Sequence, residues 1–115
     1  MILLKDFLKK IDGQILTQKV DISNTKIKDG YVSDLLSDVM GNAKEGQVWI
    51  TIMRHLNVVA VASLANLSAV VFAKNYKPEK AVIDKANEEG ICLISTSLPT
   101  FEVTGILYEM LKKTR

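Results

Sequence analysis

The sequence of 115 residues is short of the residue types on which many functional sites depend, since it contains one cysteine, one histidine and two prolines. One cysteine can form no internal disulfide and cannot by itself hold a metal ion or an iron–sulfur cluster. Cys92 lies in the apolar run 91–94, so we expect a reduced thiol in a core strand. The single histidine, His55, has no nucleophile motif beside it. We therefore expect a protein that is not an enzyme and needs no metal or cofactor.

Long apolar runs are also missing. Residues 48–72 are rich in aliphatic side chains, but Arg54, His55 and Asn66 interrupt them before a membrane-spanning length is reached. Lys5 and Asp6 interrupt the N-terminus too early for a signal peptide. These absences predict a soluble, cytoplasmic protein without membrane contact.

No strong charge of either sign is present, because 15 Lys and Arg stand against 13 Asp and Glu, for a net charge of +2. The basic C-terminus supplies more than this excess through Lys112, Lys113 and Arg115. A nucleic-acid interface needs clustered basic residues interleaved with aromatic ones, and the chain shows no such cluster. Nucleic acid is therefore not an expected partner.

What the chain does contain is an ordinary globular composition, with 48% hydrophobic and 24% charged residues. This length and composition predict one domain over residues 1–115. Residues 1–30 are expected to hold an N-terminal helix and extended segments, and residues 31–115 an α/β core.

The second half of the chain alternates apolar runs with helical patterns. The predicted strands are 48–52, 69–72 and 91–94, and the predicted helices are 57–65, 78–89 and 100–113. Pro78 is expected in the first turn of its helix, and Gly90 at its end. The continuous apolar strands predict a parallel sheet with helices on both faces, that is, an α/β fold with three α/β/α layers and a mainly parallel sheet. The helix 57–65, capped by Asn57, is expected to be buried nearly all round.

The first half is less regular. Apolar residues at helical spacing predict a helix over 3–11 that stops at Gly13. Residues 15–17, 19–22 and 27–32 are predicted to be extended. A further helix is expected to begin at a cap provided by Ser33 or Asp34 and to end at Gly41-Asn42.

Three loops follow the predicted parallel strands, at the sheet edge where ligands of such folds usually bind. The side chains there are cationic or hydrogen-bonding, which suits a small anion or the phosphates of an adenine nucleotide. Capping and turn formation would explain the same residue types without a ligand. The candidate ligand-binding residues are Arg54, His55, Asn57, Lys74, Asn75, Thr96, Ser97 and Thr100.

The last predicted helix has two apolar faces. One carries Phe101, Thr104, Gly105, Tyr108 and Leu111, and the other carries Val103, Ile106, Leu107 and Met110. Because one face suffices to cover the sheet, the second is expected to meet another copy of the chain. We assign Val103, Ile106, Leu107 and Met110 to this homodimer interface.

The stretch from about Tyr31 to Tyr108 resembles the DRTGG domain family. The residues that carry the resemblance are 49–62 (WITIMRHLNVVAVA), 69–72 (AVVF), Pro78 and 96–102 (TSLPTFE). Met53-Arg54 stands where the family has an Asp-Arg pair, and Ala73-Lys74-Asn75 stands where it has Thr-Gly-Gly. Arg54, Thr100 and Phe101 keep the family's residues.

The resemblance implies a module related to the N-terminal domain of HPr kinase/phosphorylase. Such modules usually accompany other domains, including CBS pairs in regulated pyrophosphatases, and contribute dimer contacts and effector response without chemistry of their own. The kinase phosphate loop is absent, since Gln47-Val48 stands where Lys-Ser/Thr is required after Gly41 and Gly46. We thus expect a homodimeric regulatory module that senses a small anion or nucleotide. As an alternative, similar stand-alone proteins are associated with iron hydrogenases, which implies a metalloenzyme subunit or its maturation machinery as a partner, with no small ligand.

Overall fold

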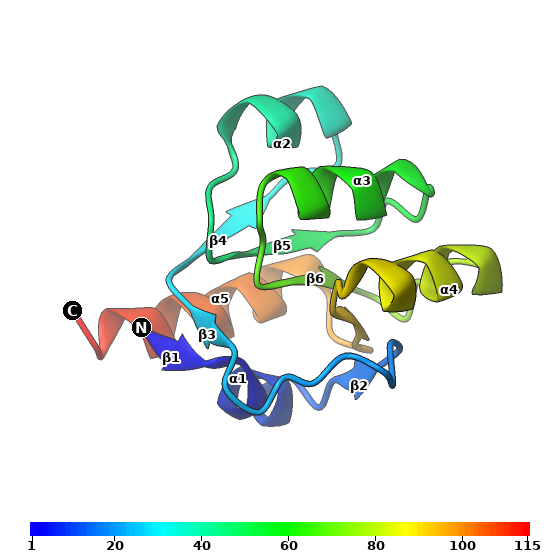
Figure 1. Cartoon of the computed structure of the whole chain (residues 1–115). Helices are drawn as coiled ribbons and strands as arrows, with labels where there is room; N and C mark the ends of the chain where they lie inside the picture. The colour runs from blue at the N-terminus through cyan, green and yellow to red at the C-terminus, as the bar shows by residue number, and fades with distance from the viewer.

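The computed structural model describes all residues, 1–115, and is built around a five-stranded sheet with the order β2-β7-β6-β5-β4 (Figure 1). Its strands are β2 (Gln14–Ile15), β4 (Asp29–Val32), β5 (Gln47–Thr51), β6 (Ala69–Phe72) and β7 (Leu93–Ser95). Strands β4 to β7 are parallel, and β2 pairs with β7 antiparallel. A separate two-stranded sheet joins β1 (Ile2–Leu3) to β3 (Lys26–Ile27).

Helices cover both faces of the large sheet. The helices are α1 (Leu4–Lys10), α2 (Leu36–Asn42), α3 (Asn57–Leu64), α4 (Lys80–Glu89) and α5 (Thr100–Lys112). Figure 1 shows α2, α3 and α4 on one side and α1 and α5 on the other. Alternate residues of β5 point to opposite sides, so Trp49 packs with α2, α3 and α4, whereas Val48 and Ile50 pack with α1 and α5. The predicted three-layer α/β/α fold with a mainly parallel sheet is confirmed.

The N-terminal third differs most from expectation. Residues 19–22 form turns instead of a strand, and the expected strand 27–32 is divided at Lys28, whose backbone N–H bonds to the carbonyl of Gly46. Neither Ser33 nor Asp34 caps α2, which follows Leu35. Gly41 and Asn42 form its last two residues instead of ending it.

Three details of the second half also differ. Pro78 is buried and lies before the N-cap residue Glu79, outside the first turn of α4. Strand β7 begins at Leu93, two residues later than expected. Helix α3 was expected to be buried nearly all round, but it is buried on one side only, and Leu64 is 80% exposed. The sheet covers one face of the helix, and no further layer covers the other. Gly90 ends α4 as predicted, in the left-handed conformation at φ 72°.

Two classes of feature are not found. None of the helices combines the length and the apolarity needed to cross a membrane. No cluster of three or more His, Cys, Asp or Glu side chains is arranged to hold a metal ion.

Candidate functional site

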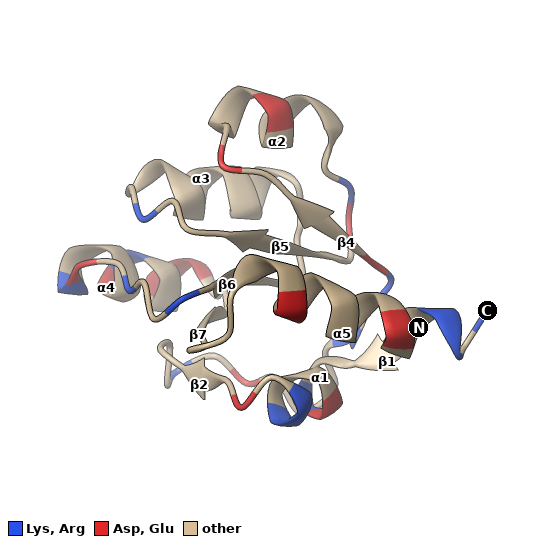
Figure 2. Ribbon diagram, turned by 180° about the vertical axis from the view of Figure 1, so that it is seen from behind, with Lys and Arg blue, Asp and Glu red and all other residues tan.

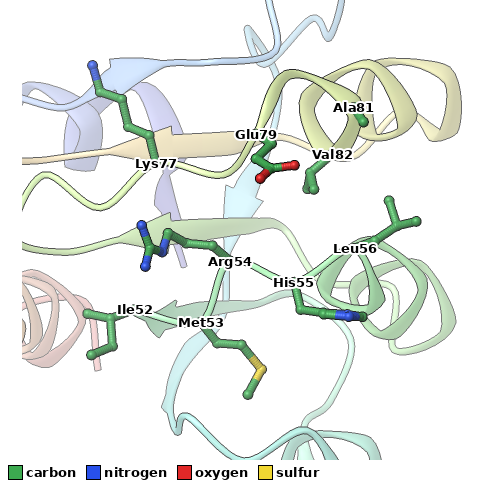
Figure 3. A pocket seen from close by; sticks show the side chains of 9 residues that line it. All are labelled: Ile52, Met53, Arg54, His55, Leu56, Lys77, Glu79, Ala81 and Val82. Atoms are coloured by element: carbon green, nitrogen blue, oxygen red, sulfur yellow. The ribbon is translucent and has the colours of Figure 1, made fainter.

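The carboxyl ends of β4 to β7 lie at one edge of the sheet, and an open cleft of about 700 Å³ lies there between the loop after β5 and the segment that leads into α4. Figure 3 shows its nine lining residues. Hydrophobic side chains form about half of the lining, and the rest is charged or polar. The residues are Ile52, Met53, Arg54, His55, Leu56, Lys77, Glu79, Ala81 and Val82.

Arg54 is the principal cation of the cleft. Its guanidinium carbon lies 4.6 Å from the ring centroid of Tyr76, a cation–π contact that restrains the side chain. Arg54 is exposed and takes part in none of the ion pairs of the molecule. Its hydrogen-bonding fork is therefore positioned and free to meet an anion.

His55 has a structural task at the start of α3. Its Nδ1 accepts a hydrogen bond from the backbone N–H of Asn57 at 3.1 Å. The N-cap position of α3 is occupied by Leu56, which cannot make such a bond, so His55 replaces the cap that we expected from Asn57. No carboxylate pairs with His55, so the cleft lacks an acid–base pair centred on it.

Lys77 and Glu79 lie on the opposite wall of the cleft. The Nζ of Lys77 donates a hydrogen bond to Oε1 of Gln14 at 3.2 Å, and Figure 3 shows its chain extending away from α4. Glu79 is exposed, and Figure 3 shows its carboxylate on the side of the cleft opposite His55. Glu79 and the apolar wall formed by Met53, Leu56 and Val82 are not among the residues predicted from the sequence. The only signal for Glu79 is its position directly before a helix.

The start of α4 adds an electrostatic element. Helix α4 has no side-chain cap, and its N-cap residue Glu79 lines the cleft together with Ala81 and Val82 from its first turn. The unpaired N–H groups of a helix N-terminus carry partial positive charge. The cleft thus combines this positive end with the guanidinium of Arg54.

Lys74 and Asn75 hold two loops together and do not line the cleft. Both adopt left-handed backbone conformations, with φ 59° and 62°. The N–H of Lys74 donates to the carbonyl of Leu98 at 2.9 Å, and that of Asn75 to the carbonyl of Thr96 at 2.8 Å. These two bonds join the loop after β6 to the loop after β7.

Thr96, Ser97 and Thr100 also lie outside the cleft lining. Thr96 is 2% exposed, and its Oγ1 donates to the carbonyl of Ile11 at 2.7 Å and accepts from the N–H of Leu98. Its side chain is therefore closed to a ligand, contrary to expectation. Ser97 is exposed on the loop, and Thr100 begins α5. Of the eight candidate residues, only Arg54 and His55 line the cleft, and Asn57 follows them at the start of α3.

The expected dimer interface on α5 needs correction. Val103 and Leu107 are almost completely buried in the core of the same chain, where they contact the sheet. Ile106 and Met110 are half-buried and pack against that core. On the opposite face Phe101 is 88% and Tyr108 56% exposed, whereas Leu111 is 3% exposed and belongs to the core.

The fold and the cleft define a small α/β module whose open site lies at the carboxyl edge of a parallel sheet. The DRTGG domain family model matches residues 6–110, and the chain therefore belongs to the DRTGG domain family. No curated protein sequence matches the chain.

A solved structure shares the fold. It is the crystal structure of the CBS and DRTGG domains of the regulatory region of Clostridium perfringens pyrophosphatase, complexed with the activator diadenosine tetraphosphate. The similarity has a TM-score of 0.68 at 15% sequence identity and covers 90% of this chain and 45% of that one. The chain thus spans less than half the length of that regulatory region.

Proposed function

We propose that the chain is a regulatory binding module without chemistry of its own, and that it takes a small anionic ligand, such as the phosphates of an adenine nucleotide, in the cleft at the carboxyl edge of the sheet. The observation that carries the proposal is the position of Arg54, which is fixed over Tyr76 at 4.6 Å and has no carboxylate partner.

The surroundings of Arg54 support a nucleotide more than a bare ion. Met53, Leu56 and Val82 offer an apolar wall for a base, and the uncapped start of α4 favours a phosphate. Glu79 would repel a phosphate beside it, but its carboxylate can accept hydrogen bonds from sugar hydroxyls. The fold also occurs in a regulatory region that was solved with a diadenosine activator.

The test is a thermal-shift and calorimetric titration of the full chain with AMP, ATP, diadenosine tetraphosphate and inorganic phosphate. Ligand at 100 times its Kd would stabilise the fold by about 2.7 kcal/mol, which raises the Tm by several degrees. Arg54→Ala is expected to weaken binding at least about tenfold, because a charged hydrogen-bond partner is lost.

Lys5→Ala provides a matched control, because Lys5 is an exposed cation on α1, in the layer remote from the cleft. It should bind as the unchanged chain does. Equal loss in both variants would indicate nonspecific attraction between charges. An absence of stabilisation by every ligand at millimolar concentration would contradict the proposal and favour a protein partner, such as a metalloenzyme subunit, as the only binding partner.

A further inference from the structure

Strand β4 is a free edge of the five-stranded sheet. It pairs with β5 on one side, and no strand pairs with its other side. Figure 2 shows β4 at the rim of the sheet, with α2 above it and α5 below. The free side of an edge strand presents unpaired backbone N–H and C=O groups, which another extended chain can meet. Lysine and proline commonly protect such edges, but β4 contains neither.

A small, largely apolar pocket lies along this edge, on the side of α5. Its lining includes Gly30 and Val32 of β4 and Leu107 and Tyr108 of α5. Its volume is about 90 Å³, about three times the share of one water molecule in the liquid, which suits a small aliphatic side chain. Side chains of an extended chain alternate between the two sides of a sheet. An added strand would therefore direct every second side chain towards α5, where one of them can enter the pocket.

Apolar side chains are exposed around the same edge. Val32 is 47% exposed on the strand itself, and Tyr108 is 56% exposed on α5. Leu35, which lies between β4 and α2, is 61% exposed. Exposed apolar groups that lie together mark an interaction surface. The edge thus offers backbone hydrogen bonds and apolar contacts side by side, the combination by which sheet edges recognise extended peptides.

The two ends of β4 differ in charge. At the amino end, Lys28 and Asp29 are each paired with an oppositely charged side chain of the same chain. At the carboxyl end, Asp34 and Asp38 take part in no ion pair. Figure 2 shows acidic but no basic residues on α2, and Arg54, in the loop after the neighbouring strand, contacts an aromatic ring instead. The carboxyl end of the edge is therefore complementary to a basic partner.

We propose that the free edge of β4 binds an extended segment of a partner protein, which joins the sheet as a further strand. The segment runs antiparallel to β4, because antiparallel pairing is slightly more stable per residue than parallel pairing. Small aliphatic side chains at alternate positions cover Val32 and fill the pocket beside Tyr108. Basic residues at the start of the segment meet Asp34 and Asp38. The cleft beside Arg54 shares no lining residue with this pocket, so the inference does not depend on the ligand proposed there.

The probe is a synthetic octapeptide with blocked termini, Lys-Lys-Thr-Val-Thr-Val-Thr-Val, titrated to about 2 mM into the ¹⁵N-labelled full chain and followed by NMR. We expect a Kd of at most about 1 mM, with shifts of the amide signals concentrated in residues 29–35 and 104–111. Hydrogen exchange at the amides of β4 should slow, because the peptide covers the open edge.

Matched peptides separate the backbone from the charge. One peptide is N-methylated at its valines and another at its threonines. Since alternate residues direct their N–H groups to the same side, one of the two should bind at least about tenfold more weakly, and the other should still bind. A peptide with the two lysines moved to the C-terminus should bind about threefold more weakly, because its cations lie away from the two aspartates.

Variants of the chain locate the contact. Val32→Asn should weaken binding about fivefold through the lost apolar contact, whereas Leu64→Asn, on the exposed face of α3, is the matched control and should bind as the unchanged chain does. Asp38→Asn should weaken the lysine peptide about threefold but leave unchanged a peptide with threonine in place of both lysines. A purely structural effect of Asp38 would weaken both peptides alike. Circular dichroism confirms that each variant is folded.

Four results would overturn the proposal. One is the absence of any shift with the lysine peptide, its reversed form and its threonine form. Another is equal binding of both N-methylated peptides, or shifts centred on residues 52–56 and 77–82, which would place the peptide outside the edge. Stronger binding of the reversed peptide would exclude the antiparallel direction. Finally, sedimentation of the free chain as a dimer that is lost on Val32→Asn would mean that a second copy occupies the edge.

Discussion

The hydroxyl of Thr51 donates a hydrogen bond to Oδ1 of Asp34 at 2.7 Å, which links the ends of two neighbouring parallel strands. The same carboxylate oxygen accepts the backbone N–H of Ile52 at 3.0 Å. Thr51 is 1% exposed, so its hydroxyl has little access to water. Asp34→Ala should therefore lower the free energy of unfolding by about 1–2 kcal/mol, measured by urea denaturation.

The control for this prediction is Thr51→Val, which keeps the shape of the side chain but removes the hydroxyl. If the two side chains stabilise the sheet edge through their mutual bond, the double variant should lose less than the two single losses added together. Strict additivity would mean that Asp34 acts only through the N–H of Ile52.

The consecutive left-handed residues Lys74 and Asn75 lead to a second prediction. A non-glycine residue at positive φ is strained by its Cβ atom, and asparagine tolerates this better than lysine. Lys74→Gly should raise the free energy of unfolding by about 0.5–1 kcal/mol, and Asn75→Gly by less. The resemblance to the DRTGG pattern places its two glycines at these positions, and here both residues have positive φ without being glycine.

Lys80→Gly is the contrasting variant, because Lys80 begins α4, where glycine weakens the helix and also removes the exposed ion pair with Asp84. It should lower stability in the same urea experiment. A loss of stability in Lys74→Gly as well would show that the left-handed conformation is not strained by lysine.

The parallel half of the fold could be predicted because its strands and helices carry strong local patterns. Strand β5 is a run of β-branched and aromatic residues, and Gly90 marks a helix end through its own backbone preference. The strands β1, β2 and β3 have two residues each, too few to show a period of two. They are defined by pairing with distant residues, as in Ile2 with Ile27, which no local pattern contains.

Only part of the candidate site could be predicted, again because a local pattern shows only residues that are close together in the sequence. Arg54 and His55 follow a clear strand, so their place at the sheet edge could be inferred. Glu79 and Val82 reach the same cleft from a segment 24 residues or more further along the chain, which only the packing of α3 against α4 reveals. On α5 both faces are apolar, and the choice between them depends on which one contacts β4 and β5.

His55 provides a third prediction, on helix capping. His55→Ala removes the only side-chain acceptor for the N–H of Asn57 and should lower the free energy of unfolding by about 0.5–1 kcal/mol. His55→Asn should recover most of this loss, because a short amide can also accept the hydrogen bond from two residues ahead. Urea denaturation without ligand separates this effect from binding. Equal losses in both variants would mean that the bond contributes nothing.

The last prediction concerns pH and the single cysteine. Burial raises the pKa of the Cys92 thiol from its ordinary value of 9.0 to about 12. In the unfolded chain the thiol ionises near pH 9, whereas in the folded chain it stays protonated. The stabilisation that the buried, neutral thiol provides is therefore complete below pH 9. It is lost as the pH rises toward 12, at about 1.4 kcal/mol per pH unit.

Cys92→Ala isolates this contribution from the tyrosines and lysines that also titrate in alkali. Between pH 9.5 and 10.5, the free energy of unfolding of the unchanged chain should fall by about 1 kcal/mol more than that of the variant. Urea denaturation at the two pH values measures the difference. The native thiol should also resist a disulfide reagent at pH 8 that modifies it readily in denaturant, because thiolate is the reactive form and Cys92 is 3% exposed. Parallel pH curves for the two proteins, or rapid modification of the native thiol, would show that Cys92 is accessible in solution.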